Sequence, residues 1–174
     1  MKLDVGCAGN RLEGYIGLDM NAGPNVDVVH DLTNLPLPFG DGAMEEVFCS
    51  HTLEHIPLDY QKPLLCEFRR ILAPGGKLRV VAPNFEFYAA EIIADSMAIE
   101  QGGTRPGVPH ALQHYEDMMA LLYRCDNWEV EVKDAHAWMF TAPYLMRVLC
   151  DCGFNPVYDL ADQGPPHVVV EGIK

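Results

Sequence analysis

Four short groups of residues in the first third of the chain each follow an apolar run directly. They contain glycines, which give the backbone conformational freedom, or polar and charged side chains. The first is Gly6-Cys7-Ala8-Gly9, whose glycines let the backbone approach a ligand closely and adopt positive φ. Asp19 and His30-Asp31-Leu32 follow, and their carboxylates can accept hydrogen bonds from ribose hydroxyls or an adenine amino group. The fourth is Ser50-His51. Together they predict a nucleoside-binding site, although each one alone also fits an ordinary turn or cap.

The spacing between the glycine turn and the first acid distinguishes two nucleoside-containing cofactors. Gly6 and Asp19 stand only 13 positions apart, whereas a dinucleotide site expects its acid about 20 residues after the glycines. A dinucleotide also needs a helix N-terminus for its pyrophosphate, and residues 9–14 are too few for both a turn and such a helix. S-adenosylmethionine (SAM) carries no phosphate, so this spacing favours SAM.

Short runs of aliphatic, β-branched and aromatic residues precede these groups and predict strands. An apolar face with helical spacing follows at 58–72, and Ala73-Pro74-Gly75-Gly76 is predicted to end that helix. Strands that alternate with crossover segments are typical of an α/β fold with a parallel sheet, which binds ligands at its carboxyl edge. The strands predicted for this part of the chain are 2–5, 15–19, 26–31, 45–49 and 77–82.

Residues 85–140 interrupt this alternation with helical patterns on both sides of a Gly/Pro-rich loop. The segment is too short to bury a core of its own. We therefore expect one domain, 1–174, in which 85–140 is a helical insertion that covers the acceptor pocket.

The last part of the chain is predicted to complete the sheet. Thr141 is a typical cap for a helix that ends at Gly153, and two strands, 155–160 and 167–172, are predicted to pair antiparallel. The chain begins at its first strand and its first crossover is short, so one face of the sheet near the first three strands lacks a helix. Bare apolar sheet is rare on monomers, and this predicts a homodimer.

Composition narrows the classes of partner. Of the 174 residues 49% are hydrophobic, and the formal net charge is −13. This charge opposes nucleic-acid binding, which relies on basic surfaces, and Glu67-Phe68-Arg69-Arg70 is too small a basic cluster to change that. The sequence has no apolar run long enough to span a membrane and no signal peptide, so we expect a cytoplasmic protein with no membrane partner.

The six cysteines are dispersed along the chain. In the absence of a secretion signal they are interpreted as reduced thiols. Cys7 and Cys49 lie at predicted strand ends, where a free cysteine behaves as a small apolar residue. Cys150-Asp151-Cys152 is open to two interpretations, a pair of metal ligands or a coincidence at a helix end.

Five motifs in order resemble those of the class I SAM-dependent methyltransferases, and most closely the small bacterial type 11 group. They are LDVGCAG, YIGLDMN, HDLTNLPLPF, FCSHTLEHI and FRRILAPGGKLRVVAPN. A later segment, which runs from His136 through Thr141 to Phe154, is similar to the tail motif of that group. The resemblance implies an α/β fold with a Rossmann-like, doubly wound, mostly parallel sheet, an antiparallel last strand and a shortened first crossover. It also implies SAM as cofactor and methyl transfer as the reaction.

The resemblance assigns a part of SAM to each group of residues. The glycine turn would line the methionine, with Ala8 in the place of the usual second glycine. Asp19 would hold the ribose, and side chains after the second and third strands would contact the adenine. Ser50-His51 would face the methionine end. The implied cofactor-binding residues are Gly6, Cys7, Ala8, Gly9, Asp19, Met20, Asp31, Leu32, Ser50 and His51.

The segment His51-Thr52-Leu53-Glu54-His55 also matches H-x-x-E-H, a zinc-peptidase pattern. That chemistry needs both histidines on one helical face, whereas this segment follows a strand and Pro57 limits any helix. The other interpretation is that Glu54 and His55 brace a loop. We predict no metal site.

The acceptor side of the site is less marked in the sequence. His136 precedes the late helix and is the candidate catalytic base for an acceptor hydroxyl or amine; the alternative is a structural histidine bonded to backbone. Asn84 and Tyr88 are candidate pocket residues. The sequence predicts a methyltransferase that acts on a small-molecule or sugar-like acceptor. A non-catalytic SAM- or nucleoside-binding module is the main alternative, and a hydrolase or dehydrogenase is a third.

Overall fold

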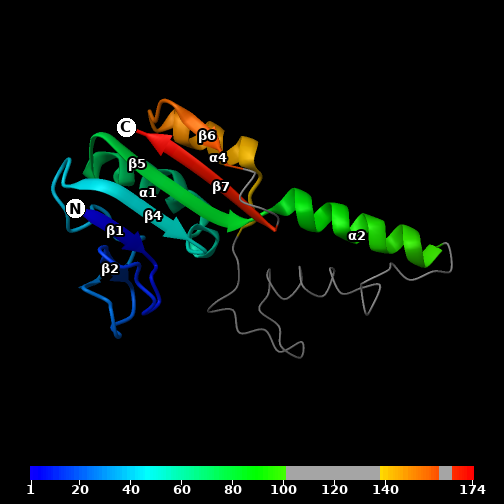
Figure 1. Cartoon of the computed structure of the whole chain (residues 1–174), viewed down its shortest axis with the longest axis horizontal. Helices are drawn as coiled ribbons and strands as arrows, with labels where there is room; N and C mark the ends of the chain where they lie inside the picture. Colours follow the sequence, from blue (N-terminus) through cyan, green and yellow to red (C-terminus); the bar gives the residue numbers. More distant parts are fainter. Residues whose placement is uncertain (101–137, 161–165) are drawn as a thin grey trace.

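The computed structural model describes residues 1–100, 138–160 and 166–174. Its centre is one seven-stranded sheet in the order β3-β2-β1-β4-β5-β7-β6 (Figure 1). Neighbouring strands from β3 to β5 run parallel, and β7 runs antiparallel to both β5 and β6. This confirms the predicted Rossmann-like α/β fold with an antiparallel last strand. The strands are Lys2–Val5 (β1), Ile16–Asp19 (β2), Val28–Val29 (β3), Met44–Ser50 (β4), Leu72–Pro83 (β5), Val157–Asp159 (β6) and His167–Ile173 (β7).

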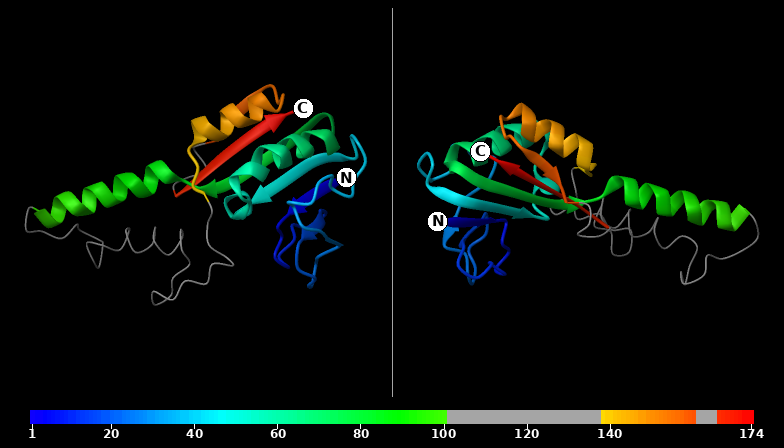
Figure 2. Two further views of the ribbon diagram at one scale, coloured as in Figure 1. Left: turned by 180° about the vertical axis from the view of Figure 1, so that it is seen from behind. Right: turned by 45° about the horizontal axis from the view of Figure 1, so that its top comes forward.

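Two helices, α1 (Leu58–Ile71) and α4 (Ala142–Asp151), cover the same face of the sheet, as the view from behind shows (Figure 2). Their apolar stripes, which include Phe68 and Leu145, are fully buried against alternate residues of the strands. Each such side chain contributes about 1.5–3 kcal/mol through removal from water. The Thr141 hydroxyl accepts a hydrogen bond from the Tyr144 backbone N–H at 3.4 Å, so the predicted cap of α4 is confirmed.

The opposite face of the sheet carries charged side chains in cross-strand pairs. Lys2 stands opposite Glu46 in the register of β1 and β4, with 3.0 Å between Nζ and Oε2. Arg79 stands opposite Glu171 in the register of β5 and β7, with 2.8 Å between Nη2 and Oε2. Opposite charges on directly facing residues are favourable on an exposed sheet. The expectation of a bare apolar face concerned the first three strands, and at β1 it is wrong for the position of Lys2, which carries a charge pair.

The boundary between α1 and β5 differs from the sequence prediction. The helix ends at Ile71, next to Ala73-Pro74-Gly75-Gly76, as predicted, but β5 begins at Leu72 rather than at residue 77, so these four residues belong to the strand. The strand accommodates this stretch through a shift of register against β4 between Met44 and Glu46. An added Cβ at Gly76 would lie 2.9 Å from the Ala73 carbonyl oxygen, so close backbone approach requires glycine there.

Helix α2 (Phe85–Glu100) matches the predicted bounds and extends beyond the sheet (Figure 1). The rest of the predicted insertion, with His136, lies outside the described residues, so its helical character and covering role remain predictions. A short 3-10 helix, η1 (Leu53–His55), follows β4. Among the described residues, none of the helices is long and apolar enough to cross a membrane.

The interpretation of all cysteines as reduced thiols is wrong for two of them. Cys66 on α1 and Cys152 at the end of α4 form a disulfide, with their Cα atoms 4.9 Å apart. The sequence hides this pair, because 86 positions separate the two residues and only the packing of α1 on α4 brings them together. The Cys152 sulfur is therefore not available as half of a metal pair. Cys7 and Cys49 are buried and free, as predicted.

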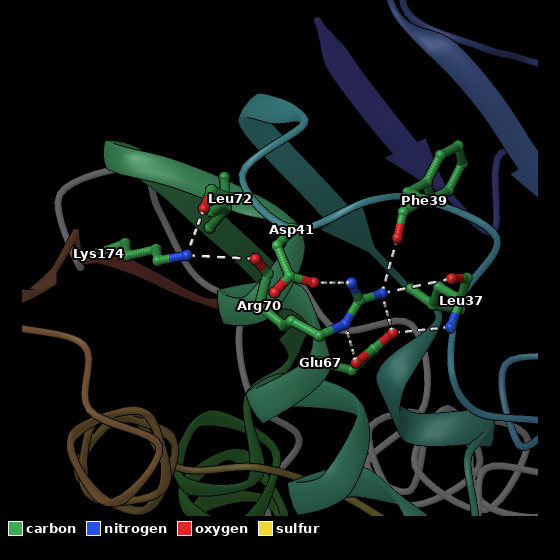
Figure 3. A network of polar contacts seen from close by, with 7 residues as sticks. All are labelled: Leu37, Phe39, Asp41, Glu67, Arg70, Leu72 and Lys174. Atoms are coloured by element: carbon green, nitrogen blue, oxygen red, sulfur yellow. Dashed lines mark hydrogen bonds and ion pairs between the residues drawn. The ribbon is translucent and has the colours of Figure 1, made fainter.

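A polar network ties the segment after β3 to α1 (Figure 3). The Arg70 guanidinium donates to both carboxylate oxygens of Glu67, pairs with Asp41 and donates to the Phe39 carbonyl oxygen at 2.8 Å. The Leu37 backbone N–H donates to Glu67 Oε1 at 2.7 Å. The basic cluster noted in the sequence is thus engaged inside the molecule, where it fixes the chain that follows Asp31.

Candidate functional site

The glycine turn after β1 packs tightly on the exit of β4. Gly6 has φ of 68°, and a Cβ added there would lie 2.1 Å from Thr52 Oγ1. The Thr52 hydroxyl is itself fixed by the carbonyl oxygens of Val5 at 3.1 Å and Ser50 at 3.0 Å. Only glycine fits at position 6, because the positive φ disfavours other residues and because a Cβ would clash with Thr52. Thr52 could not be recognised from the sequence, because its role depends on the neighbouring strand.

Asp19 links the end of β2 to the glycine turn. Its Oδ2 accepts a hydrogen bond from the Ala8 backbone N–H and its Oδ1 accepts one from the Asn21 backbone N–H, both at 2.9 Å. A carboxylate has about four acceptor positions, so two hydrogen bonds leave capacity for ribose hydroxyls. Ala8 has φ of 44°, in the left-handed region that glycine occupies more easily.

The residues expected around the adenine differ in exposure. The Met20 side chain is 64% exposed next to Asp19, whereas Leu32 is 7% exposed and belongs to the hydrophobic core. Asp31 Oδ1 accepts hydrogen bonds from the backbone N–H and the hydroxyl of Thr33, which order the turn and hold the pKa of Asp31 below its ordinary value. These three residues follow β2 and β3, at the same edge as the glycine turn.

Two more side chains shape the loop between β1 and β2. Asp4 is buried and accepts a hydrogen bond from the Leu12 backbone N–H at 2.8 Å, and its burial raises its pKa. Cys7 is buried, and its sulfur lies 3.9 Å from the Asn25 carbonyl oxygen. Its thiol therefore points into the protein, and burial raises its pKa. Cys7 can serve a ligand through its backbone rather than through sulfur.

The end of β4 brings three ionisable side chains together. His51 follows the strand with φ of 49°, and its Nδ1 lies 3.2 Å from Glu54 Oε1 on η1. The ring of His167, at the start of β7, contacts the His51 ring edge to face, with 4.8 Å between centroids. Glu54 is fully buried. His167 was not a candidate from the sequence, because only the antiparallel course of β7 places its first residue at this edge.

The acceptor candidates are placed only in part. Asn84 Oδ1 accepts hydrogen bonds from the backbone N–H groups of Glu86 and Phe87, at 3.0 and 3.3 Å, so this side chain caps α2. Tyr88 lies in the first turns of α2 and is half-buried. His136 lies outside the described residues. The Trp138 backbone N–H donates to the Glu54 carbonyl oxygen at 3.2 Å, which joins the chain before α4 to this edge.

The arrangement fits SAM. Glycine at position 6 keeps the turn close to β4, and Asp19 holds the turn by Ala8 while it retains acceptor capacity for a ribose. In residues 1–100, 138–160 and 166–174 there is no group of three or more His, Cys, Asp or Glu side chains that could hold a metal ion.

Comparison with known proteins gives a family match and a shared fold. Residues 3–80 match the family model described as a methyltransferase domain. No curated protein matches the sequence significantly.

Solved structures resemble the chain over 99% of its length. A SAM-dependent methyltransferase of Thermotoga maritima, described as a possible histamine N-methyltransferase, has a TM-score of 0.63, 20% identity and 81% of its own chain covered. The 1,6-didemethyltoxoflavin-N1-methyltransferase of Burkholderia thailandensis, with 1,6-didemethyltoxoflavin and S-adenosylhomocysteine bound, has a TM-score of 0.59, 16% identity and 70% of its own chain covered. A SAM-dependent methyltransferase of Methanosarcina mazei has a TM-score of 0.60, 20% identity and 91% covered.

The family match supports the resemblance over residues 3–80, and these solved structures, all below 25% identity, show the shared fold.

Proposed function

We propose that this chain is a class I SAM-dependent methyltransferase and that it transfers the methyl group of SAM to a small-molecule or sugar-like acceptor. The observation that carries the proposal is the connection between the glycine turn and Asp19 through the Ala8 backbone N–H. This contact places a turn that a ligand can approach beside a carboxylate with acceptor capacity, at the carboxyl edge of the sheet. A bound didemethyltoxoflavin in one structure of the same fold supports an acceptor of modest size.

In this proposal each part of the edge contacts one part of SAM. Gly6, Ala8 and Gly9 line the methionine through their backbone, Asp19 accepts from the ribose hydroxyls, and the chain after β2 and β3 contacts the adenine. SAM supplies a methyl group that its sulfonium already activates. The protein therefore contributes mainly by alignment of the acceptor and by removal of any proton that the acceptor must lose.

A non-catalytic SAM- or nucleoside-binding module is the second candidate. The observation in its favour is Ala8, a non-glycine residue at φ of 44° in the turn that would meet the methionine. Its methyl group occupies space next to the ligand that a glycine would leave open.

We also propose a domain organisation, a cellular location and an oligomeric state for this methyltransferase. Residues 85–140 form an insertion within the single domain 1–174 and cover the acceptor, the protein is cytoplasmic, and two copies associate as a homodimer. The net charge of −13 supports the absence of a nucleic-acid acceptor.

Two measurements on the full chain test the function. Isothermal titration with SAM should show binding to one site per chain, and a chain that does not bind SAM would contradict both candidates. Production of S-adenosylhomocysteine from SAM in the presence of a metabolite pool should exceed production without the pool. Binding without any such increase would favour the non-catalytic module.

A further inference from the structure

The cluster of His51, Glu54 and His167 at the carboxyl edge has a composition that SAM binding does not require. Three elements supply it: the end of β4, η1 and the start of β7. His51 Nδ1 lies 3.2 Å from Glu54 Oε1, and the His51 and His167 rings meet at 82°. The cofactor is a cation with hydroxyl and amino groups, and it needs no imidazole pair for its recognition.

Glu54 is the unusual member of the cluster because of its burial. Its side chain is 0% exposed, and neither carboxylate oxygen has a hydrogen-bond partner of good geometry among the described residues. Within that part of the chain, the Glu54 carboxylate lies at ion-pair distance from His51 Nδ1. Burial of a carboxylate with so little compensation is costly. A purely structural position would be filled better by an apolar side chain of similar size, so the buried carboxyl group points to a function.

His51 has the geometry that such a carboxylate would support. It is a non-glycine residue at φ of 49°, and strained backbone of this kind concentrates at functional sites. Its side chain is 45% exposed although Glu54 beneath it is fully buried. The contact between His51 Nδ1 and Glu54 Oε1 is an ion-pair contact rather than a hydrogen bond of good geometry. When the proton of the imidazole is on Nδ1 and faces the carboxylate, Nε2 is unprotonated and able to accept a proton. Thr52, the next residue, packs against Gly6, so His51 stands beside the proposed methionine end of SAM.

His167 limits the positive charge in the cluster. Burial, together with the neighbouring His51, lowers its pKa, and the opposing influence of Glu54 does not reverse this. Among the described residues, the titratable side chains that contact the His51 ring are thus a carboxylate from η1 and a neutral imidazole from β7. Neither of these two neighbours carries a positive charge that would oppose the gain of a proton by His51 during a reaction.

We infer that His51, positioned by Glu54, binds the acceptor through a hydroxyl or amine hydrogen and removes that proton during methyl transfer. The inference rests on the proposed function and specifies its substrate class: the methylated atom is an oxygen or nitrogen that carries hydrogen. The acceptor atom forms its bond to the methyl carbon while the carbon–sulfur bond breaks and its electron pair returns to sulfur. The acceptor proton passes to His51 Nε2, and the resulting imidazolium is held by the Glu54 carboxylate. His51 is then a catalytic residue and Glu54 a positioning residue.

The test uses the full chain and three variants. His51→Asn removes the imidazole but keeps a residue type that tolerates positive φ. Glu54→Gln keeps the shape but replaces an acceptor-only group by one that also donates. Glu46→Gln is the matched control, because Glu46 is a partly buried glutamate at the other end of β4. SAM affinity is measured by titration, and methyl transfer is measured against primary amines, phenols and aliphatic alcohols. A tertiary amine and a thioether serve as acceptors that have no proton to lose.

We expect the wild-type chain and Glu46→Gln to methylate at least one protic acceptor. At saturating SAM, His51→Asn and Glu54→Gln should lose about 100-fold or more of that rate, the usual contribution of a general base, and Glu54→Gln should change SAM affinity less than threefold. In the complex with S-adenosylhomocysteine, nitrogen-15 NMR should show the Nδ1–H tautomer of His51 in wild type and a mixture in Glu54→Gln. Urea denaturation of Glu54→Gln should show unchanged or greater stability.

Several results would overturn the inference while they leave the proposed function in place. They are full protic activity in either variant, methylation of only the aprotic acceptors, an unchanged tautomer in Glu54→Gln, and activity lost only in proportion to lost stability. If the wild-type chain binds SAM but transfers to none of the acceptors, the proposed function fails first, and the inference fails with it.

Discussion

Asp19 joins two roles at one residue, since it orders the glycine turn and is proposed to hold the ribose. A hydrogen bond to a charged group is worth about 1.5–3 kcal/mol, and 1.4 kcal/mol corresponds to a factor of ten in affinity. Asp19→Ala should therefore weaken SAM binding at least tenfold in a calorimetric titration. Asp27→Asn is the matched control, because Asp27 also accepts from a backbone N–H, that of Gly17 at 2.8 Å, but lies outside the proposed contacts. Equal affinity in Asp19→Ala and wild type would remove Asp19 from the site.

Glu67 makes the stability of the protein depend on acidity. Its hydrogen bonds from Arg70, supported by that from the Leu37 N–H, hold its pKa below the ordinary value of 4.5. A carboxyl with a lowered folded-state pKa stabilises the native state above its unfolded pKa, and this contribution is lost as the pH falls through the folded value. Glu67→Gln should lower the free energy of unfolding at pH 7 by about 1–3 kcal/mol.

The pH dependence separates this contribution from a simple loss of packing. Between about pH 5 and pH 3, urea denaturation of Glu67→Gln should change less with pH than that of wild type. Glu13→Gln, at an exposed position, serves as the control and should follow the wild-type curve. Parallel curves for Glu67→Gln and wild type would contradict the assignment.

At the scale of elements, α1 and α4 are joined by a covalent bond as well as by packing. The Cys66–Cys152 disulfide closes a loop of 86 positions, and such bonds typically stabilise by about 2–4 kcal/mol. Peptide mapping without reductant should find the two cysteines linked, and Cys152→Ser should lower the unfolding free energy by that amount. Cys150→Ser, at the neighbouring exposed and free thiol, should change little. Alkylation of both Cys66 and Cys152 in the native, unreduced protein would show that the bond is absent.

The elements also show what the sequence could and could not reveal. Strands such as Lys2–Val5 and the helix Phe85–Glu100 were predictable because local patterns of apolar residues determine them. The start of β5 was not, since Ala73-Pro74-Gly75-Gly76 has the composition of a turn and only pairing with β4 holds it in the sheet. In the same way, Asp19 was recognisable by its position after a strand. His167 was not, because its proximity to His51 depends on the antiparallel register of β7.

At the scale of the whole molecule, self-association remains a prediction with a changed physical basis. In the described part of the chain, the sheet face opposite α1 and α4 (Figure 2) has no helix on it. At two cross-strand positions this face carries paired charges rather than bare apolar surface. Exposed apolar side chains lie instead on α2, where Ile93 is 60% and Met97 is 54% exposed. Sedimentation equilibrium at micromolar concentration should show twice the chain mass of 19.4 kDa, and the double variant Ile93→Ser/Met97→Ser should reduce association. A single 19.4 kDa species in wild type would contradict the homodimer.

The contact between Gly6 and Thr52 has an evolutionary consequence. An added Cβ at position 6 would lie within 2.1–2.9 Å of Thr52 Oγ1, Cγ2 and Cβ, so even alanine at position 52 would leave a clash. Selection for a folded chain alone is enough to retain this glycine, whatever binds at the edge. A descendant that had lost its cofactor would keep Gly6. At position 19, by contrast, only the two hydrogen bonds from backbone N–H groups would still favour an acid, so substitutions there would be tolerated more easily. In comparisons among relatives, retention of the acid is therefore a better marker of preserved cofactor use than retention of the glycine.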